Sequence, residues 1–100
     1  MTLRLIVRSV AERDLLDAFA WHEERTTDLG ADFLQCVDLA LVHITRYPLS
    51  GPLFYQEYRR ILIHRFPYGI FYVVTPEIIS VVAVMHLAQN PAKIKKTLTR

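Results

Sequence analysis

The sequence predicts an α+β fold, in which an antiparallel sheet packs on an αα-hairpin and the elements follow the order β-α-α-β-β-β. Residues 58–87 form three apolar runs separated by the turn segments 67–69 (PYG) and 76–77 (PE), a pattern typical of short strands joined by tight turns. Residues 10–46 instead place apolar side chains three and four positions apart, which indicates amphipathic helices. We therefore expect an N-terminal strand and a C-terminal three-strand meander to share one sheet.

The chain is predicted to begin with a strand over residues 3–8 (LRLIVR), followed by a helix over about residues 10–26. Ser9 and Glu12 have the spacing of a capping box, in which the two side chains accept N–H groups at the start of a helix. The apolar stripe of this helix is predicted to be buried and consists of Ala11, Leu15, Ala18, Phe19 and His22.

A second helix is predicted over about residues 29–46, with Asp28 as its cap and Tyr47-Pro48 as its end. Residues 49–54 are expected to form a loop. The short link between the helices predicts an antiparallel hairpin. If the first strand runs up, the helices run down and then up, so the strand over residues 58–66 should be antiparallel to the first strand. The strand that pairs with the first strand is left open.

The meander strands are predicted over residues 58–66, 70–75 and 78–87, and the last two are apolar on both faces. Two helices cover only one face of a sheet, so something else must cover the other. We expect a partner protein to do so. The alternative is a strongly curved sheet with the basic tail, residues 92–100, folded over it. That tail is predicted to be either a helical turn or disordered.

The composition predicts a single domain over residues 1–100. Cys36 is the only cysteine, so no disulfide framework is expected, and the four histidines lack metal-ligand spacing. We expect no metal and no cofactor. The sequence has neither a signal-peptide pattern nor a membrane-spanning run, which predicts a cytoplasmic protein without a membrane association.

Charge is distributed unevenly between the two halves of the chain. Residues 1–50 hold five Lys or Arg against eight Asp or Glu, whereas residues 51–100 hold seven against two. This polarity predicts an anionic partner for the second half, with a solvated basic edge as the alternative.

One group of strand residues has the types needed for acid–base chemistry on RNA. Arg, His and Tyr side chains on a concave sheet can hold a phosphate and act on a 2′-hydroxyl. The candidates for a catalytic role in such an RNase are Arg60, His64, Tyr68 and His86. On chemistry alone we favour the alternative, in which they are polar residues at strand ends or ion-pair partners of the acidic helices.

The whole chain resembles the RelE/ParE superfamily of toxins from bacterial type II toxin–antitoxin modules. The element order matches, and so do the segments 11–15 (AERDL), 21–24 (WHEE), 30–34 (GADFL), 59–63 (RRILI), 65–72 (RFPYGIFY) and 82–86 (VAVMH). The resemblance implies a toxin bound by an antitoxin whose C-terminal segment wraps it.

The details of the resemblance favour the ParE-like branch. RelE-like members cleave mRNA in the ribosomal A site with basic side chains on the meander, whereas ParE-like members are gyrase poisons that lack this set. Gly69 and Leu62 stand where RelE-like members have basic residues, and no Arg or Lys follows His86 directly. Gln89 also departs from many ParE-like relatives, which carry two arginines after this histidine.

The resemblance therefore implies a ParE-like toxin that inhibits DNA gyrase and forms a hetero-oligomer with its cognate antitoxin, rather than an enzyme. Two alternatives stay open: a RelE-like ribosome-dependent mRNA endonuclease, and a non-toxic relative that binds an antitoxin or has a regulatory role. The residues predicted to bind the target or partner are Arg59, Arg60, Arg65, Lys93, Lys95, Lys96 and Arg100.

Overall fold

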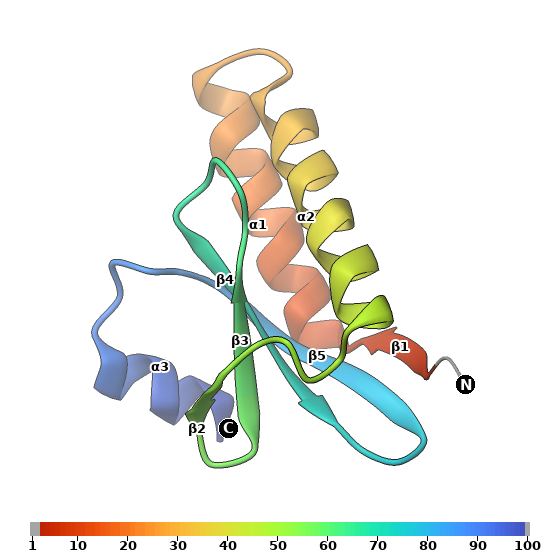
Figure 1. Ribbon diagram of the computed structural model, residues 1–100. Helices are drawn as coiled ribbons and strands as arrows, with labels where there is room; N and C mark the ends of the chain where they lie inside the picture. Colours follow the sequence, from red (N-terminus) through yellow and green to blue (C-terminus); the bar gives the residue numbers. More distant parts are fainter. Residues whose placement is uncertain (1–2, 100) are drawn as a thin grey trace.

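Five strands and three helices make up residues 3–99, the part of the chain that the computed structural model describes (Figure 1). The predicted α+β class is confirmed. In chain order the elements are β1 (Arg4–Val7), α1 (Ser9–Arg25), α2 (Leu29–Arg46), β2 (Leu53–Tyr55), β3 (Tyr58–Leu62), β4 (Tyr68–Val74), β5 (Ile78–His86) and α3 (Pro91–Leu98).

The sheet has the strand order β1-β5-β4-β3-β2. The prediction of an antiparallel sheet is correct only in part, because one pair of strands is parallel. β1 pairs in parallel with β5, from Arg4 opposite Ile78 to Val7 opposite Val81. The remaining neighbours in the sheet are antiparallel.

The expectation that the strand after the helices is antiparallel to β1 is wrong for β3, and an unpredicted strand is the reason. Residues 53–55, assigned to a loop from the sequence, form β2 and pair with β3 in an antiparallel hairpin. This extra strand reverses the chain once more, so β3 runs parallel to β1. The ring of Phe54 on β2 packs edge-on against Phe71 at 5.3 Å between centroids, which gives so short a strand an apolar anchor.

The strand ends also shift within the meander. β3 ends at Leu62 rather than at residue 66, and β4 begins at Tyr68. The turn therefore occupies residues 63–67, where Arg65 adopts a left-handed backbone conformation with φ of 74°. Tyr68 and Gly69, predicted as turn residues, belong to β4.

The predicted helix bounds are close to those observed, and Asp28 occupies the predicted N-cap position, but neither predicted set of capping hydrogen bonds forms. Arg8 occupies the N-cap position of α1, so Ser9 is already helical and forms no capping box with Glu12. Asp28 is at the N-cap of α2 with φ of 70°, and its side chain caps nothing.

Glu23, on the last turns of α1, caps α2 instead. Its two carboxylate oxygens accept the N–H groups of Asp28 at 2.9 Å and Gly30 at 3.0 Å. The negative charge lies at the positive end of the α2 dipole, which adds to the stabilisation. Gly30 also allows the close approach of the two helices, because a Cβ there would lie 2.8 Å from the ring of Phe19.

Two apolar clusters lie on opposite faces of the sheet. The cluster beneath α1 and α2 consists of Ala11, Ala18, Phe33, Cys36, Val37, Ile44, Ile63, Phe66, Ile70, Tyr72, Ile79, Val81 and Val84. The cluster on the other face consists of Phe71, Ala83 and Met85 from the sheet with Ile94 and Leu98 from α3.

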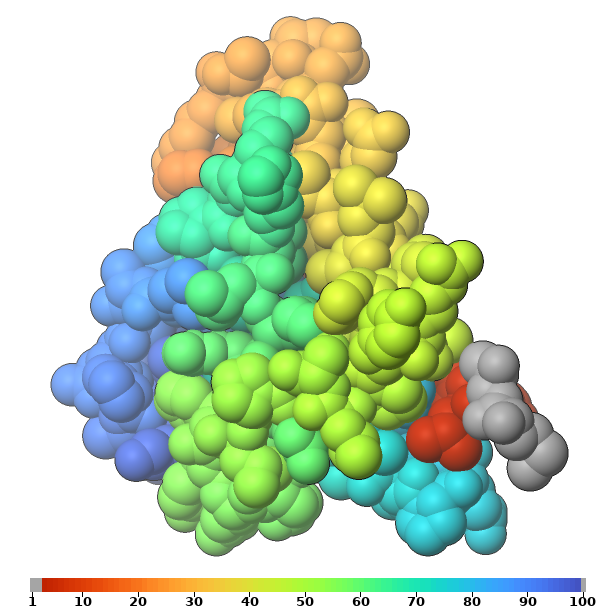
Figure 2. All heavy atoms as spheres, viewed as in Figure 1, coloured from red at the N-terminus to blue at the C-terminus, as the bar shows by residue number. Residues whose placement is uncertain are grey.

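The C-terminal tail is therefore a helix that covers the second face of the sheet, so the expected partner protein is not needed there. α3 begins at Pro91, and the side chain of Asn90 caps it by accepting the N–H of Ala92 at 2.8 Å. The apolar pair Ile94 and Leu98, one helical turn apart, faces the sheet. In the space-filling view α3 (blue) adjoins the β2–β3 segment (green) (Figure 2). Within residues 3–99 no helix combines the length and apolar character needed to cross a bilayer.

Candidate functional site

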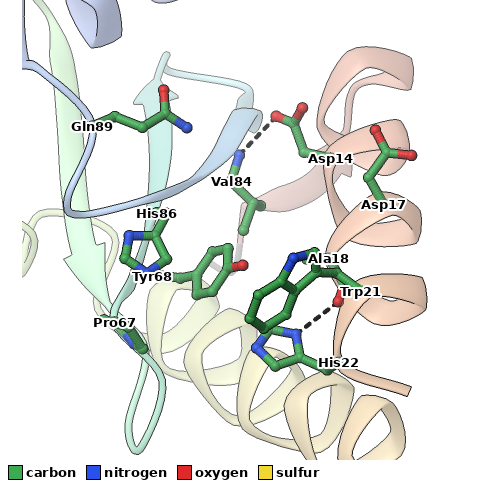
Figure 3. A pocket seen from close by; sticks show the side chains of 10 residues that line it. All are labelled: Asp14, Asp17, Ala18, Trp21, His22, Pro67, Tyr68, Val84, His86 and Gln89. Atoms are coloured by element: carbon green, nitrogen blue, oxygen red, sulfur yellow. Dashed lines mark hydrogen bonds between the residues drawn. The ribbon is translucent and has the colours of Figure 1, made fainter. Parts of the chain in front are cut away.

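An open pocket of about 610 Å³ lies between α1 and the C-terminal end of β5 (Figure 3). Its volume is in the range of small-ligand and peptide side-chain sites. The lining residues are Asp14, Asp17, Ala18, Trp21, His22, Pro67, Tyr68, Val84, His86 and Gln89.

The pocket exists because β1 is shorter than β5. β1 pairs only with Ile78–Val81, so residues 82–86 of β5 have no strand beside their outer edge among the described residues. Asp14 on α1 reaches this edge, where its Oδ2 accepts the N–H of Val84 at 3.0 Å (Figure 3). A carboxylate thus takes the place that a neighbouring strand's carbonyl would fill.

His22 forms the aromatic floor of the pocket. It is buried, and its Nδ1 donates to the carbonyl of Ala18 at 2.7 Å. Its ring stacks on Phe33 with 5.0 Å between centroids and 15° between planes, and Phe66 packs edge-on against it at 5.2 Å. These ring contacts and the hydrogen bond to Ala18 hold the imidazole in one orientation.

Tyr68 and His86 form one wall of the pocket and lie directly opposite each other on β4 and β5. Their rings pack edge to face with 5.1 Å between centroids. Burial raises the pKa of Tyr68, because it disfavours the phenolate. Nδ1 of His86 accepts the N–H of Ala88 at 3.0 Å, so the neutral ring carries its proton on Nε2.

The structure brings together only two of the four residues proposed for RNA cleavage. Arg60 lies opposite Phe71 in the β3–β4 ladder, so it projects toward the α3 face, away from the pocket. Its guanidinium lies 4.8 Å from the centroid of Phe54, and its methylenes fill the space above Gly69, where a Cβ would come within 3.1 Å. His64 lies beyond the end of β3 and is exposed. Tyr68 and His86 thus meet in the pocket without Arg60 or His64.

The residues predicted to bind the target separate into three places. Arg60 shares the α3 side of the sheet with three exposed lysines of α3; we call these four residues the basic face, and they are Arg60, Lys93, Lys95 and Lys96. Lys95 Nζ lies 5.4 Å from the ring centroid of Tyr55.

The other predicted basic residues lie elsewhere. Arg59 projects to the opposite side of the sheet and donates to the carbonyl of Gly51 at 2.8 Å, so it holds the segment between α2 and β2. Arg65 lies on the β3–β4 turn, 3.8 Å from a carboxylate oxygen of Asp32. Arg100 lies outside the described residues.

Sequence reasoning missed the acidic side of the pocket. Asp14, Asp17 and Trp21 are three and four positions apart, so they share one face of α1 beside its buried stripe. That spacing could have predicted that the three side chains lie together on the helix surface. Their proximity to β5 could not be seen without the tertiary structure. Within the described part of the chain, no three His, Cys, Asp or Glu side chains are grouped to hold a metal ion.

Known proteins share the sequence pattern and the fold. Residues 5–91 match the family model described as the ParE toxin of the type II toxin–antitoxin system parDE. The chain is 29% identical over 100 residues to Toxin ParE2 of Mycobacterium tuberculosis strains CDC 1551 / Oshkosh and ATCC 25618 / H37Rv, with 99% of this chain and 95% of each relative covered. The structure of a chromosomal ParDE TA system from P. aeruginosa is similar with a TM-score of 0.77 and 13% identity, covering 86% of this chain and 97% of that one. The last likeness bears on the fold alone.

Proposed function

We propose that this chain, which belongs to the ParE toxin family of type II toxin–antitoxin systems, inhibits DNA gyrase in the cytoplasm and is neutralised by a cognate antitoxin. The observation that carries the proposal is the family match over residues 5–91, which includes both helices of the hairpin and all of the sheet except Arg4. In this proposal, inhibition results from binding to gyrase and requires no catalytic residue on this chain.

The separation of the polar residues on the sheet supports binding over RNA cleavage. An acid–base pair acts on a 2′-hydroxyl only within hydrogen-bond reach, and a phosphate-binding arginine must lie beside it. Arg60 is on the α3 face, whereas Tyr68 and His86 line the pocket on the side of α1. One RNA linkage therefore cannot contact all three side chains in this arrangement.

The basic face is the surface that we assign to the target. Its lysines are exposed on α3, and α3 contains no acidic residue. Charges at the rim of an interface mainly raise the association rate and make binding sensitive to salt. We therefore expect the basic face to dock on an anionic region of gyrase, with α3 held rigidly by Ile94 and Leu98.

A supercoiling assay with purified gyrase tests the proposal. The wild-type chain should block supercoiling and trap cleaved DNA, should leave translation unaffected, and should lose both effects when the antitoxin is added. Changing Lys93, Lys95 and Lys96 together to Gln should weaken inhibition roughly tenfold, from three exposed charge contacts of about 0.5 kcal/mol each.

The matched control removes the same charge elsewhere, by changing exposed Arg4, Arg13 and Arg46 together to Gln, and it should inhibit like the wild type. Gyrase that stays active at excess toxin would refute the proposal. Cleavage of mRNA only in the presence of ribosomes would establish the endonuclease instead. Unchanged growth on induction of the chain alone would favour a non-toxic relative.

A further inference from the structure

We propose that the outward face of α2 binds a second copy of this chain, so that two α2 helices cross there in a weak dimer with two-fold symmetry. The inference goes beyond the proposed function and does not depend on it, because self-association involves neither gyrase nor the antitoxin. It rests on exposed apolar side chains, on the shape of the helix surface and on the order of its charges.

The outward face of α2 exposes large apolar side chains. α2 packs on α1 and on the sheet, and no element among residues 3–99 covers its opposite side (Figure 1). Leu39 is 66% exposed there, and Val42, one helical turn further, is 55% exposed. Leu62 is 55% exposed at the end of β3, and it lines the same hollow of about 310 Å³ as Leu39. A group of exposed aliphatic side chains of this kind is typical of a protein contact surface.

The shape of this face suits a second helix. Asp38, Val42 and Arg46 are four positions apart, so they form a ridge along the outward side of α2. Beside the ridge is a groove, a hollow of about 500 Å³ whose lining includes the ridge together with Leu41 and Thr45. Two helices whose ridges of this spacing interdigitate cross at about 50°, the commonest packing class in globular proteins. The ridge of each copy then lies in the groove of the other.

The charges on the ridge name a second copy as the occupant. Asp38 and Arg46 lie four positions before and four positions after Val42. A two-fold axis beside Val42 makes the two ridges run in opposite directions, which places Asp38 of each copy beside Arg46 of the other. Both side chains are exposed, and neither forms an ion pair within the described part of the chain. Each copy thus presents the complement of its own charge pattern, and the assembly closes at two copies.

The corresponding exposed ridge of α1 lacks this self-complementarity. It consists of Glu12, Leu16, Ala20 and Glu24, with the apolar residues between two acidic ones. The same two-fold arrangement would place Glu12 of one copy beside Glu24 of the other, and like charges opposite each other oppose association. The charge pattern therefore selects α2 over α1 as the contact helix.

The dimer leaves the basic face accessible. α3 covers the face of the sheet opposite to the hairpin, so crossing of the α2 helices does not bury its lysines. The assembly therefore carries two basic faces, one on each copy. A contact made mainly by one helix from each copy is at the small end of protein interfaces, so the dimer should be weak and should form as the concentration rises.

Sedimentation equilibrium of the full chain, without antitoxin, tests the inference with charge-reversal variants. The wild type should show a monomer–dimer equilibrium that salt weakens. Asp38→Arg and Arg46→Asp should each raise the dimer Kd at least tenfold, because either change turns both reciprocal ion pairs into like-charge contacts. An equimolar mixture of the two variants should dimerise again, since one ridge is then wholly cationic and the other wholly anionic.

The matched controls make the same charge changes on α1. Glu24→Arg and Arg13→Asp alter exposed side chains away from the α2 ridge and should dimerise like the wild type, and thermal unfolding checks that every variant is folded. A wild-type chain that stays monomeric at about 1 mM would overturn the inference. A mixture that associates no better than its two components would overturn it as well.

Antitoxin titration distinguishes the other possible occupant of this face. If the wild type is monomeric and Asp38→Arg weakens antitoxin binding tenfold, the face belongs to the antitoxin and the inference fails. The outcome for the proposed function is separate, because gyrase inhibition by the wild-type chain enters none of these measurements.

Discussion

Removing the hydroxyl group of Tyr72 should lower the free energy of unfolding substantially, although the change deletes only one heavy atom. Tyr72 is fully buried on β4, and its O–H donates to the carbonyl of Pro48 at 2.8 Å. The same oxygen accepts the N–H of Gly51 at 3.0 Å. One buried oxygen thus satisfies two backbone groups of the segment that leads from α2 to β2.

The size of the effect follows from those two hydrogen bonds. Tyr72→Phe keeps the ring and leaves the buried N–H of Gly51 without its acceptor. Two lost bonds at about 1 kcal/mol each, with the cost of an unsatisfied buried donor, amount to about 2–3 kcal/mol. For a domain of this size the Tm should fall by roughly 10–20 °C.

Urea unfolding followed by circular dichroism measures this change in the free energy of unfolding. The matched control is Tyr47→Phe, because Tyr47 is 58% exposed and its hydroxyl makes no hydrogen bond within residues 3–99. The free energy of unfolding of this variant should stay within about 0.5 kcal/mol of the wild-type value. A change below about 0.5 kcal/mol for Tyr72→Phe would refute the reasoning, because the bridging oxygen would then contribute nothing net.

A double-mutant cycle adds a test of the same geometry. A Cβ at Gly51 would lie 2.5 Å from the hydroxyl oxygen of Tyr72, so Gly51→Ala should be strongly destabilising in the wild type. In the Tyr72→Phe background that oxygen is gone, and the same substitution should cost less. Additive effects would mean that the two groups do not touch.

Three further outcomes are expected. Leu98→Ala should destabilise by about 2 kcal/mol and speed amide exchange throughout α3, because Leu98 is one of the two buried anchors of that helix; unchanged exchange would contradict the packing. Glu23→Ala should cost about 1 kcal/mol through loss of the α2 cap, whereas exposed Glu24→Ala should be neutral, and equal effects would remove the capping role. Because burial raises the pKa of Tyr68 above 10.0, the unfolded chain loses this proton first, so stability should fall as pH rises above about 10. Tyr68→Phe should flatten that decline in urea titrations and Tyr47→Phe should not; parallel curves for Tyr68→Phe and wild type would exclude the effect.

Much of the candidate function was accessible from sequence, because the resemblance rests on several segments spread along nearly the whole chain. The resemblance to the RelE/ParE superfamily, placed on the ParE-like branch, is confirmed by the family match and by the similarity to Toxin ParE2. Gly69 was interpreted as a missing basic residue. The structure adds that the Arg60 side chain occupies the space above it.

The candidate site was predictable only in part. Tyr68 was expected in the turn before the middle strand and His86 near the end of the last strand, whereas the structure places them directly opposite each other on β4 and β5. Arg60 and His64 were both expected on the strand over residues 58–66, but β3 ends at Leu62, so His64 lies beyond the strand and its side chain no longer follows the alternation that places Arg60. The partnership of Asp14 with Val84, 70 residues apart, left no trace in any local pattern.

The sequence by itself determined the local elements of this protein. Helical periodicity located α1 and α2, and the turn residues between apolar runs located the meander, since both signals reflect which side chains a short segment can bury. The tertiary structure decided what those elements meet: β1 beside β5 rather than beside another strand, α3 over the second face of the sheet, and Glu23 at the start of α2. Each of these depends on contacts between segments far apart in the chain, where several partners of similar apolar character compete and only the packing of the whole domain selects one.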